Sequence, residues 1–186
     1  MVTENLARAF ASTRGVLENM KDADLDASTP CASWSIRDLL NHIVGGTHWF
    51  AATTESGVAP EQDGTDWTAG DILASFDAGS AAAVAAFGAP GAQEKILKLP
   101  FGEFPGAAFM GLATSDAFTH GWDLARATGQ STDLDPELAS QLLAAAAMMV
   151  PDQFRGPEPM PFGPKVEPPA GATAADKLAA FLGRQV

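Results

Sequence analysis

The sequence contains no tyrosine, one cysteine and only three histidines in 186 residues. Because Cys31 is alone, an intramolecular disulfide and the structural zinc sites built on several thiolates are both excluded. Without tyrosine, the chain has no phenol to act as a general acid or base. It also lacks the segments GxGxxG, GxxxxGK(S/T), HExxH and GxSxG, which mark dinucleotide, P-loop, zinc-protease and serine-hydrolase sites.

Basic residues are scarce as well. Eleven Lys and Arg against 23 Asp and Glu give a formal charge of −12, which repels phosphate backbones and anionic lipid headgroups. Apolar runs such as 142–150 are much shorter than the ~18 residues of a transmembrane helix. The N-terminus carries Glu4 and Arg8 where a signal peptide is apolar. We therefore expect a cytoplasmic globular protein that binds neither nucleic acid nor membranes.

The chain does contain apolar residues at helical spacing, in segments separated by Gly and Pro. Four long helices are predicted, starting at Thr3, at a capping box over 35–38, at a second capping box over 68–71, and at Gly106. The first is expected to end near Met20, the third at Gly88 and the fourth at Gly129. This pattern predicts an all-α fold, a four-helix bundle forming one domain over 1–186.

Shorter elements are expected around the bundle. Residues 95–102 suggest a short strand or hairpin, or else a loop, and Asp135 with Pro136 opens a helix that runs to Met149. The Pro- and Gly-rich segment 151–171 is expected to be an irregular loop, either covering a cleft or packing across the bundle. A small C-terminal helix follows the cap at Thr173.

Polar residues on one stripe of the fourth helix are the most informative feature. Asp116, His120 and Asp123 follow one another at spacings of four and three, so they share a face. In the second helix His42 lies on the edge of the apolar stripe. If the two helices are neighbours, His42, Asp116 and His120 converge as two imidazoles and a carboxylate. That set suits Zn²⁺, and also Ni²⁺ or Fe²⁺.

The predicted pocket around these ligands is lined by small and apolar residues, namely Gly46, Trp49, Phe109 and Leu112. The alternative is a hydrogen-bonded polar pair that only stabilises the helix. His48 lies about 120° around the helix from His42 and is expected at the surface or in an interface. Cys31 is either a reactive thiol near a helix N-terminus or a packing residue. Trp34, Trp49 and Trp122 are expected in the core or in a cleft wall.

Two blocks carry a resemblance to a known family. TPCASWSIRDLLNHIVGG and SDAFTHGWDLARATGQ resemble the DinB-like superfamily, and more narrowly the metal-binding N-terminal domain of mycothiol-dependent maleylpyruvate isomerase and its short relatives. KLPFGEFPGAAF and FGPKVEPP add to the resemblance, which extends over nearly the whole chain. It implies a four-helix bundle that holds a divalent metal, often zinc. The family's ligand positions correspond to His42, Asp116 and His120, with Asp116 in place of a glutamate.

The resemblance also implies a chemistry. A bound metal would lower the pKa of a low-molecular-weight thiol such as mycothiol, which then attacks an electrophilic substrate. Asp123 is expected to orient a ligand histidine, or else to be a surface charge or a backbone partner. The isomerase has a further C-terminal domain that these residues do not include, so its reaction is not carried over. A non-catalytic metal-binding bundle and a metal-free polar network remain alternatives, and a homodimer is compatible with the sequence.

Overall fold

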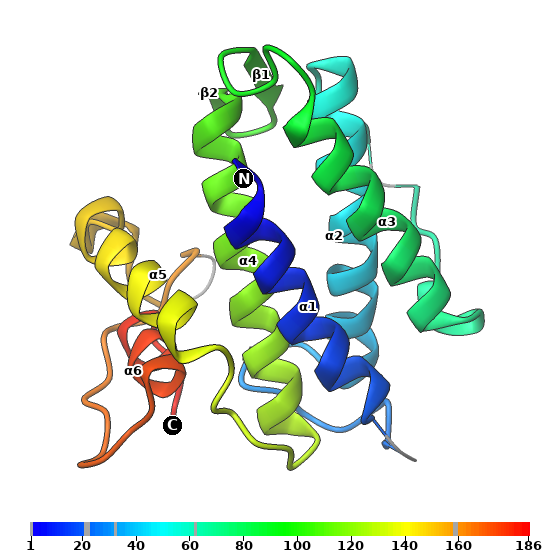
Figure 1. Ribbon diagram of the computed structural model, residues 1–186. Coiled ribbons are helices and arrows are strands. Elements are labelled where there is room, and N and C mark those ends of the chain that lie inside the picture. Colours follow the sequence, from blue (N-terminus) through cyan, green and yellow to red (C-terminus); the bar gives the residue numbers. More distant parts are fainter. Residues whose placement is uncertain (1, 21–22, 32, 62, 158–159) are drawn as a thin grey trace.

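The computed structural model describes residues 2–20, 23–31, 33–61, 63–157 and 160–186. Its bundle consists of α1 (Glu4–Glu18), α2 (Ile36–Ser56), α3 (Ile72–Gly88) and α4 (Gly106–Ala127). These helices lie side by side (Figure 1), and α1 and α2 each contact both α3 and α4. The expected all-α fold with a four-helix bundle is confirmed.

An antiparallel hairpin lies at one end of the bundle, between α3 and α4. It pairs β1 (Ile96–Leu99) with β2 (Gly102–Pro105), as the sequence predicted. The end of α2 lies here too, because Val58 forms a bridge with Lys98. The connection through η1 (Trp67–Ala69) then returns to the beginning of α2, where the Asn41 side chain accepts a hydrogen bond from the Trp67 backbone at 2.6 Å. The half of the bundle far from the hairpin therefore holds the start of α2 and the end of α4.

The C-terminal third forms a smaller group of elements beside α4 (Figure 1). It comprises α5 (Pro136–Met149), η2 (Asp152–Phe154) and α6 (Ala174–Phe181), and α6 packs on both α5 and α4. The indole nitrogen of Trp122 on α4 donates to Asp176 in the capping box of α6 at 2.9 Å. The predicted short C-terminal helices are confirmed. Where the structure describes the intervening loop, it is irregular except for η2 and one bridge, Arg155 to Phe162.

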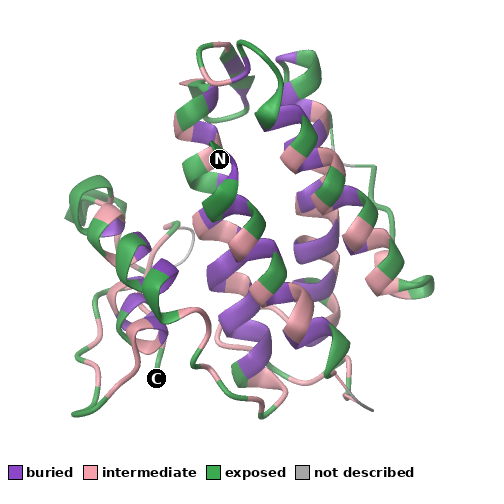
Figure 2. Cartoon of the chain, viewed as in Figure 1, coloured by how far each residue is buried: buried purple, intermediate pink, exposed green. Residues whose placement is uncertain are grey.

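Buried residues form stripes along the bundle helices (Figure 2). The largest side chains with almost no exposed surface are aromatic: Trp122, Phe76, Phe87, Phe109 and Phe118. Among the described residues, no helix is both long and apolar enough to cross a bilayer.

Helix ends follow the local capping chemistry in most places. α2 begins with the expected capping box between Ser35 and Asp38, and it ends at Gly57, whose φ of 88° is the left-handed conformation that favours glycine. The first helix is shorter than expected at its C-terminal end, which lies at Glu18. The expected capping box over 68–71 is wrong. Asp71 alone caps α3 by accepting from Ala74, while Thr68 belongs to η1 and donates to Asp66.

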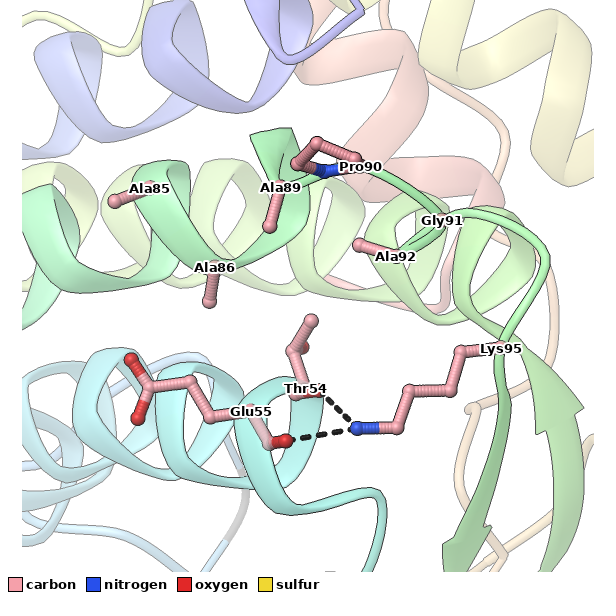
Figure 3. Close-up of a pocket in the computed structure, with 9 residues that line it drawn as sticks. All are labelled: Thr54, Glu55, Ala85, Ala86, Ala89, Pro90, Gly91, Ala92 and Lys95. Carbon is pink, nitrogen blue, oxygen red and sulfur yellow. Dashed lines mark hydrogen bonds between the residues drawn. The ribbon is translucent and has the colours of Figure 1, made fainter.

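Lys95 holds the C-terminal end of α2. Its ammonium group donates to the carbonyl oxygens of Thr54 at 3.1 Å and of Glu55 at 2.7 Å. Figure 3 shows this lysine beside a hollow lined largely by alanines at the ends of α2 and α3. A positive charge on the last carbonyls of a helix is favourable, because those oxygens have no partner within the helix.

Lys95→Met is expected to lower the free energy of unfolding by about 1 kcal/mol, since it keeps the alkyl stem and removes the donor. Urea unfolding followed by circular dichroism measures the change. Lys98→Met is the matched control, because Lys98 is exposed on the neighbouring strand. It should change the free energy by less than about 0.5 kcal/mol. Equal losses in the two variants would show that the contact with α2 contributes nothing.

Candidate metal centre

Three side chains from α2 and α4 meet in the half of the bundle far from the hairpin. His42 Nε2 lies 3.3 Å from Asp116 Oδ1, and His120 Nε2 lies 3.5 Å from the same oxygen. The two imidazole rings are 4.5 Å apart between centroids and nearly perpendicular, at 72°. One nitrogen from each ring and one carboxylate oxygen lie within 4.8 Å of one another. The sequence thus predicted correctly that these three residues are neighbours.

The local structure of α2 and α4 explains why these three side chains converge. The capping box at Ser35 and Asp38 fixes the first turn of α2, so His42 faces α4 from the next turn. Asp116 and His120 lie one turn apart on α4 and point the same way. The side chains of His42 and Asp116 are 32% and 23% exposed, whereas that of His120 is 13% exposed. The centre is therefore open on the side of His42 and Asp116 and closed behind His120.

Space for a ligand comes from Gly46, one turn after His42. A Cβ at this position would lie 4.0 Å from Asp116 Oδ2 and 3.6 Å from the ring of Phe50. A longer side chain would therefore extend into the space beside the carboxylate. This space, and a donor set of two imidazoles and a carboxylate, fit a divalent cation of the zinc type.

The predicted pocket walls lie at different depths. Leu112, one turn before Asp116, is 37% exposed, and Trp49 on α2 is partly buried. Phe109 has no exposed surface and packs against Trp49, Phe50 and Phe87, so it lies in the core behind the centre. Leu112 and Trp49, unlike Phe109, therefore have surface available to a ligand.

Trp34 covers the two imidazoles. Its ring centroid lies 4.8 Å from that of His42 and 5.5 Å from that of His120, and it stacks on the latter at 29°. Sequence reasoning placed Trp34 in the core or in a cleft wall, and the structure places it against the rings of His42 and His120. Trp122, by contrast, is buried and bonded to α6.

Asp123 lies behind His120 and is fully buried. Its Oδ2 atom accepts the Nδ1 proton of His120 at 3.0 Å and the thiol proton of Cys31 at 3.1 Å. Because Nδ1 carries the proton of this bond, Nε2 of the neutral ring presents its lone pair toward Asp116 and His42. The arrangement is the one that Asp123 was expected to provide if His120 binds a metal.

The carboxylates here are held ionised. Burial by itself raises the pKa of Asp116, but the charges and hydrogen bonds of His120 and His42 lower it well below its usual value. Burial likewise raises the pKa of Asp123, whereas the hydrogen bond from His120 and the charge of Arg184 lower it to about 2. Burial lowers the pKa of His120, but the charge of Asp116 raises it well above the ordinary value. A cation at His120 Nε2 would therefore take the place of a proton.

Arg184 is the residue that sequence reasoning missed. It follows α6, and its guanidinium donates to both oxygens of Asp123, from Nε at 3.2 Å and from Nη2 at 3.1 Å. No spacing pattern links it to Asp123, which precedes it by 61 residues. Because Arg184 already neutralises Asp123, the second group of donors, Cys31, His120 and Asp123, is a poorer place for a cation than His42, Asp116 and His120.

His48 lies apart from the centre. Its ring stacks on Trp67 at 4.5 Å and 7°, and its Nε2 donates to the carbonyl of Ser75 at 3.0 Å. These contacts join α2 to the segment around the start of α3. His48 is thus half-buried between elements and is not one of the converging donors.

Comparison of the sequence with known proteins identifies a family. The chain is 45% identical to two uncharacterised proteins, one from each of two strains of Mycobacterium tuberculosis, across all of its own length and 97% of theirs. No solved structure matches it significantly. Residues 6–125, which include most of α1 and α4 and all of α2 and α3, match the model of the mycothiol maleylpyruvate isomerase N-terminal domain. His42, Asp116 and His120 lie within this range. The chain therefore belongs to the family of the mycothiol maleylpyruvate isomerase N-terminal domain.

Proposed function

We propose that the protein is a metal-dependent enzyme that joins a low-molecular-weight thiol, such as mycothiol, to an electrophilic small molecule. The observation that carries the proposal is the convergence of His42 Nε2 and His120 Nε2 on Asp116 Oδ1 at a partly exposed position. The family supports the choice of thiol, since its description names mycothiol. Zn²⁺ suits the donor set best, and Ni²⁺ or Fe²⁺ would also fit.

A divalent cation at this position supplies one kind of chemistry: it lowers the pKa of a thiol that binds to it, so that thiolate forms near neutral pH. The residues of the chain provide the surroundings. His42, Asp116 and His120 hold the cation from α2 and α4, and Trp34 covers their rings on one side. Gly46 leaves room beside Asp116, and exposed Leu112 offers an apolar contact for the organic part of a substrate.

The proposed reaction forms a carbon–sulfur bond between the thiol and an electrophilic carbon. In an addition to a conjugated double bond, the π bond opens and the thiol proton ends on the neighbouring carbon. In a substitution on an aryl halide, the carbon–halogen bond breaks, and halide and the thiol proton leave. The product is an S-conjugate, or an isomer of the substrate once the thiol has left again. A homodimeric state remains a prediction. A cytoplasmic location accords with the single, unpaired cysteine.

The test measures thiol consumption and product mass. Zinc-loaded protein is incubated with mycothiol and either maleylpyruvate or a chromogenic aryl halide, and the products are identified by mass spectrometry. We expect turnover with mycothiol, little with glutathione, and loss of turnover after chelation that zinc restores. Bound zinc without any thiol-dependent product would overturn the enzymatic proposal in favour of the non-catalytic metal-binding bundle.

A further inference from the structure

Arg184 connects the C-terminal tail to the candidate metal centre. Its side chain is 14% exposed, and Nε and Nη2 contact the two oxygens of Asp123. The residue lies beyond 6–125, the part of the chain that matches the family model. The contact therefore joins a segment outside the matched region to a residue inside it.

Asp123 needs this partner. A buried carboxylate is unfavourable unless its charge is balanced and its oxygens accept hydrogen bonds. Arg184 supplies a positive charge and a two-point contact, which fixes the plane of the carboxylate as well as its charge. Nε of Arg184 binds Oδ1, and Nη2 binds Oδ2, the same oxygen that accepts from Nδ1 of His120 and from the Cys31 thiol.

The direction of Nε2, the second ring nitrogen of His120, depends on the same contact with Asp123. Because Nδ1 is bound to Asp123 on one side of the ring, Nε2 faces Asp116 and His42 on the other. A carboxylate that rotated or moved would let the ring turn about its side-chain bonds. Partners of this kind, one step behind a metal ligand, set the ligand's orientation and basicity.

We infer that Arg184 is a positioning residue for the metal centre, acting through Asp123 to hold His120 with Nε2 directed at the metal. The inference rests on the proposed function, in which His120 is a metal ligand. It makes the C-terminal tail part of the centre, although none of its residues is among the converging donors His42, Asp116 and His120.

Arg155 provides a matched control. It is also a buried arginine that holds the same tail, because its Nη1 donates to the carbonyl of Phe181 at 2.6 Å and its guanidinium stacks over the Phe181 ring. Its hydrogen bonds and ion pairs with the described residues involve neither Asp123 nor His120. Arg155→Gln therefore loosens the tail without removing a contact at the centre, whereas Arg184→Gln removes the contact with Asp123.

The experiment compares wild type, Arg184→Gln, Arg184→Lys and Arg155→Gln in the full-length chain. Zinc affinity is measured by competition with a chromogenic chelator, the ligand field by the visible spectrum of the Co²⁺ form, and stability by thermal unfolding. We expect Arg184→Gln to weaken zinc binding about 10-fold or more and to change the Co²⁺ spectrum. Arg184→Lys should recover part of the affinity, because it keeps the charge. Arg155→Gln should keep wild-type affinity and spectrum even if it unfolds at a lower temperature.

A second readout does not depend on metal. In the metal-free protein, the Nδ1 proton of His120 that is bonded to Asp123 should give a slowly exchanging downfield NMR signal in wild type and in Arg155→Gln. That signal should be lost in Arg184→Gln. If wild type binds no zinc, the proposed function fails, and this signal alone decides whether Arg184 positions His120.

Two results would overturn the inference. One is an equal loss of zinc affinity in Arg184→Gln and Arg155→Gln, which would mean that the tail matters only as a structural support. The other is an unchanged His120 signal and an unchanged Co²⁺ spectrum in Arg184→Gln.

Discussion

His42→Ala is expected to abolish the binding of zinc, whereas His48→Ala leaves it intact. Both histidines lie on α2, six residues apart, so the two variants remove the same side chain from the same helix. His42 points at Asp116 and His120, while His48 stacks on Trp67 and bonds to Ser75. Loss of one donor out of three should weaken binding by more than about 100-fold, because even partners behind a ligand account for 10- to 100-fold.

The measurement is the metal content of tag-free protein by mass spectrometry, followed by zinc titration of chelated protein. Wild type and His48→Ala should take up about one zinc per chain at one site of this kind. His120→Ala should behave like His42→Ala, since the two imidazoles approach the same carboxylate oxygen. Tight zinc binding that survives in both the His42 and the His120 variants would place the metal elsewhere, and no tight uptake by wild type would remove the centre altogether.

Gly121→Ala is expected to destabilise the fold strongly, and Gly111→Ala on the same helix to stabilise it. A Cβ at Gly121 would collide with Thr13 of α1, whose hydroxyl donates to the carbonyl of Ala117 at 2.7 Å. The collision involves the backbone of Thr13 as well, at 3.2 Å from its Cα, so rotation of the side chain does not relieve it. A Cβ at Gly111 would meet nothing within 4 Å.

The expected changes have opposite signs. Gly121→Ala should lower the free energy of unfolding by about 2 kcal/mol, the net of overpacking and the better helix propensity of alanine. Gly111→Ala should raise it by about 0.5–1 kcal/mol. Urea unfolding of the metal-free proteins isolates these effects from metal binding. Stabilisation by both substitutions would mean that α1 and α4 do not pack as closely as described.

The helices and the Asp116–His120 pair were predictable because both depend on local rules. Capping residues at Ser35, Asp135 and Thr173 mark helix starts through bonds to the following turn, and helical periodicity places Asp116 beside His120. The pairing of α2 with α4 does not follow from periodicity, and the family resemblance supplied it. The error at 68–71 arose because Asp66 accepts from both the backbone and the hydroxyl of Thr68, so Thr68 belongs to η1 and Asp71 is the cap of α3.

The residues around the three converging donors were only partly predictable from the sequence; they are Asp123, Arg184 and Trp34. Asp123 shares the face of His120, so its nearness follows from spacing along one helix. Arg184 reaches Asp123 after an irregular segment and a short helix, and no periodicity extends across such a path. Trp34 precedes α2, where backbone direction rather than sequence spacing decides what its ring covers.

The separation of the donors along the chain determines when a cation can be acquired. His42 and Asp116 are 74 residues apart, and they come together only once α2 has docked against α4. An unfolded or partly made chain offers Asp116 and His120 four residues apart, but not the third donor beside them. A cation held by these three residues would therefore be loaded after folding, through the face where His42 and Asp116 are partly exposed. A cation that binds only the native state stabilises it against unfolding. The concentration of free metal in the cell would then set the fraction of the protein that is unfolded.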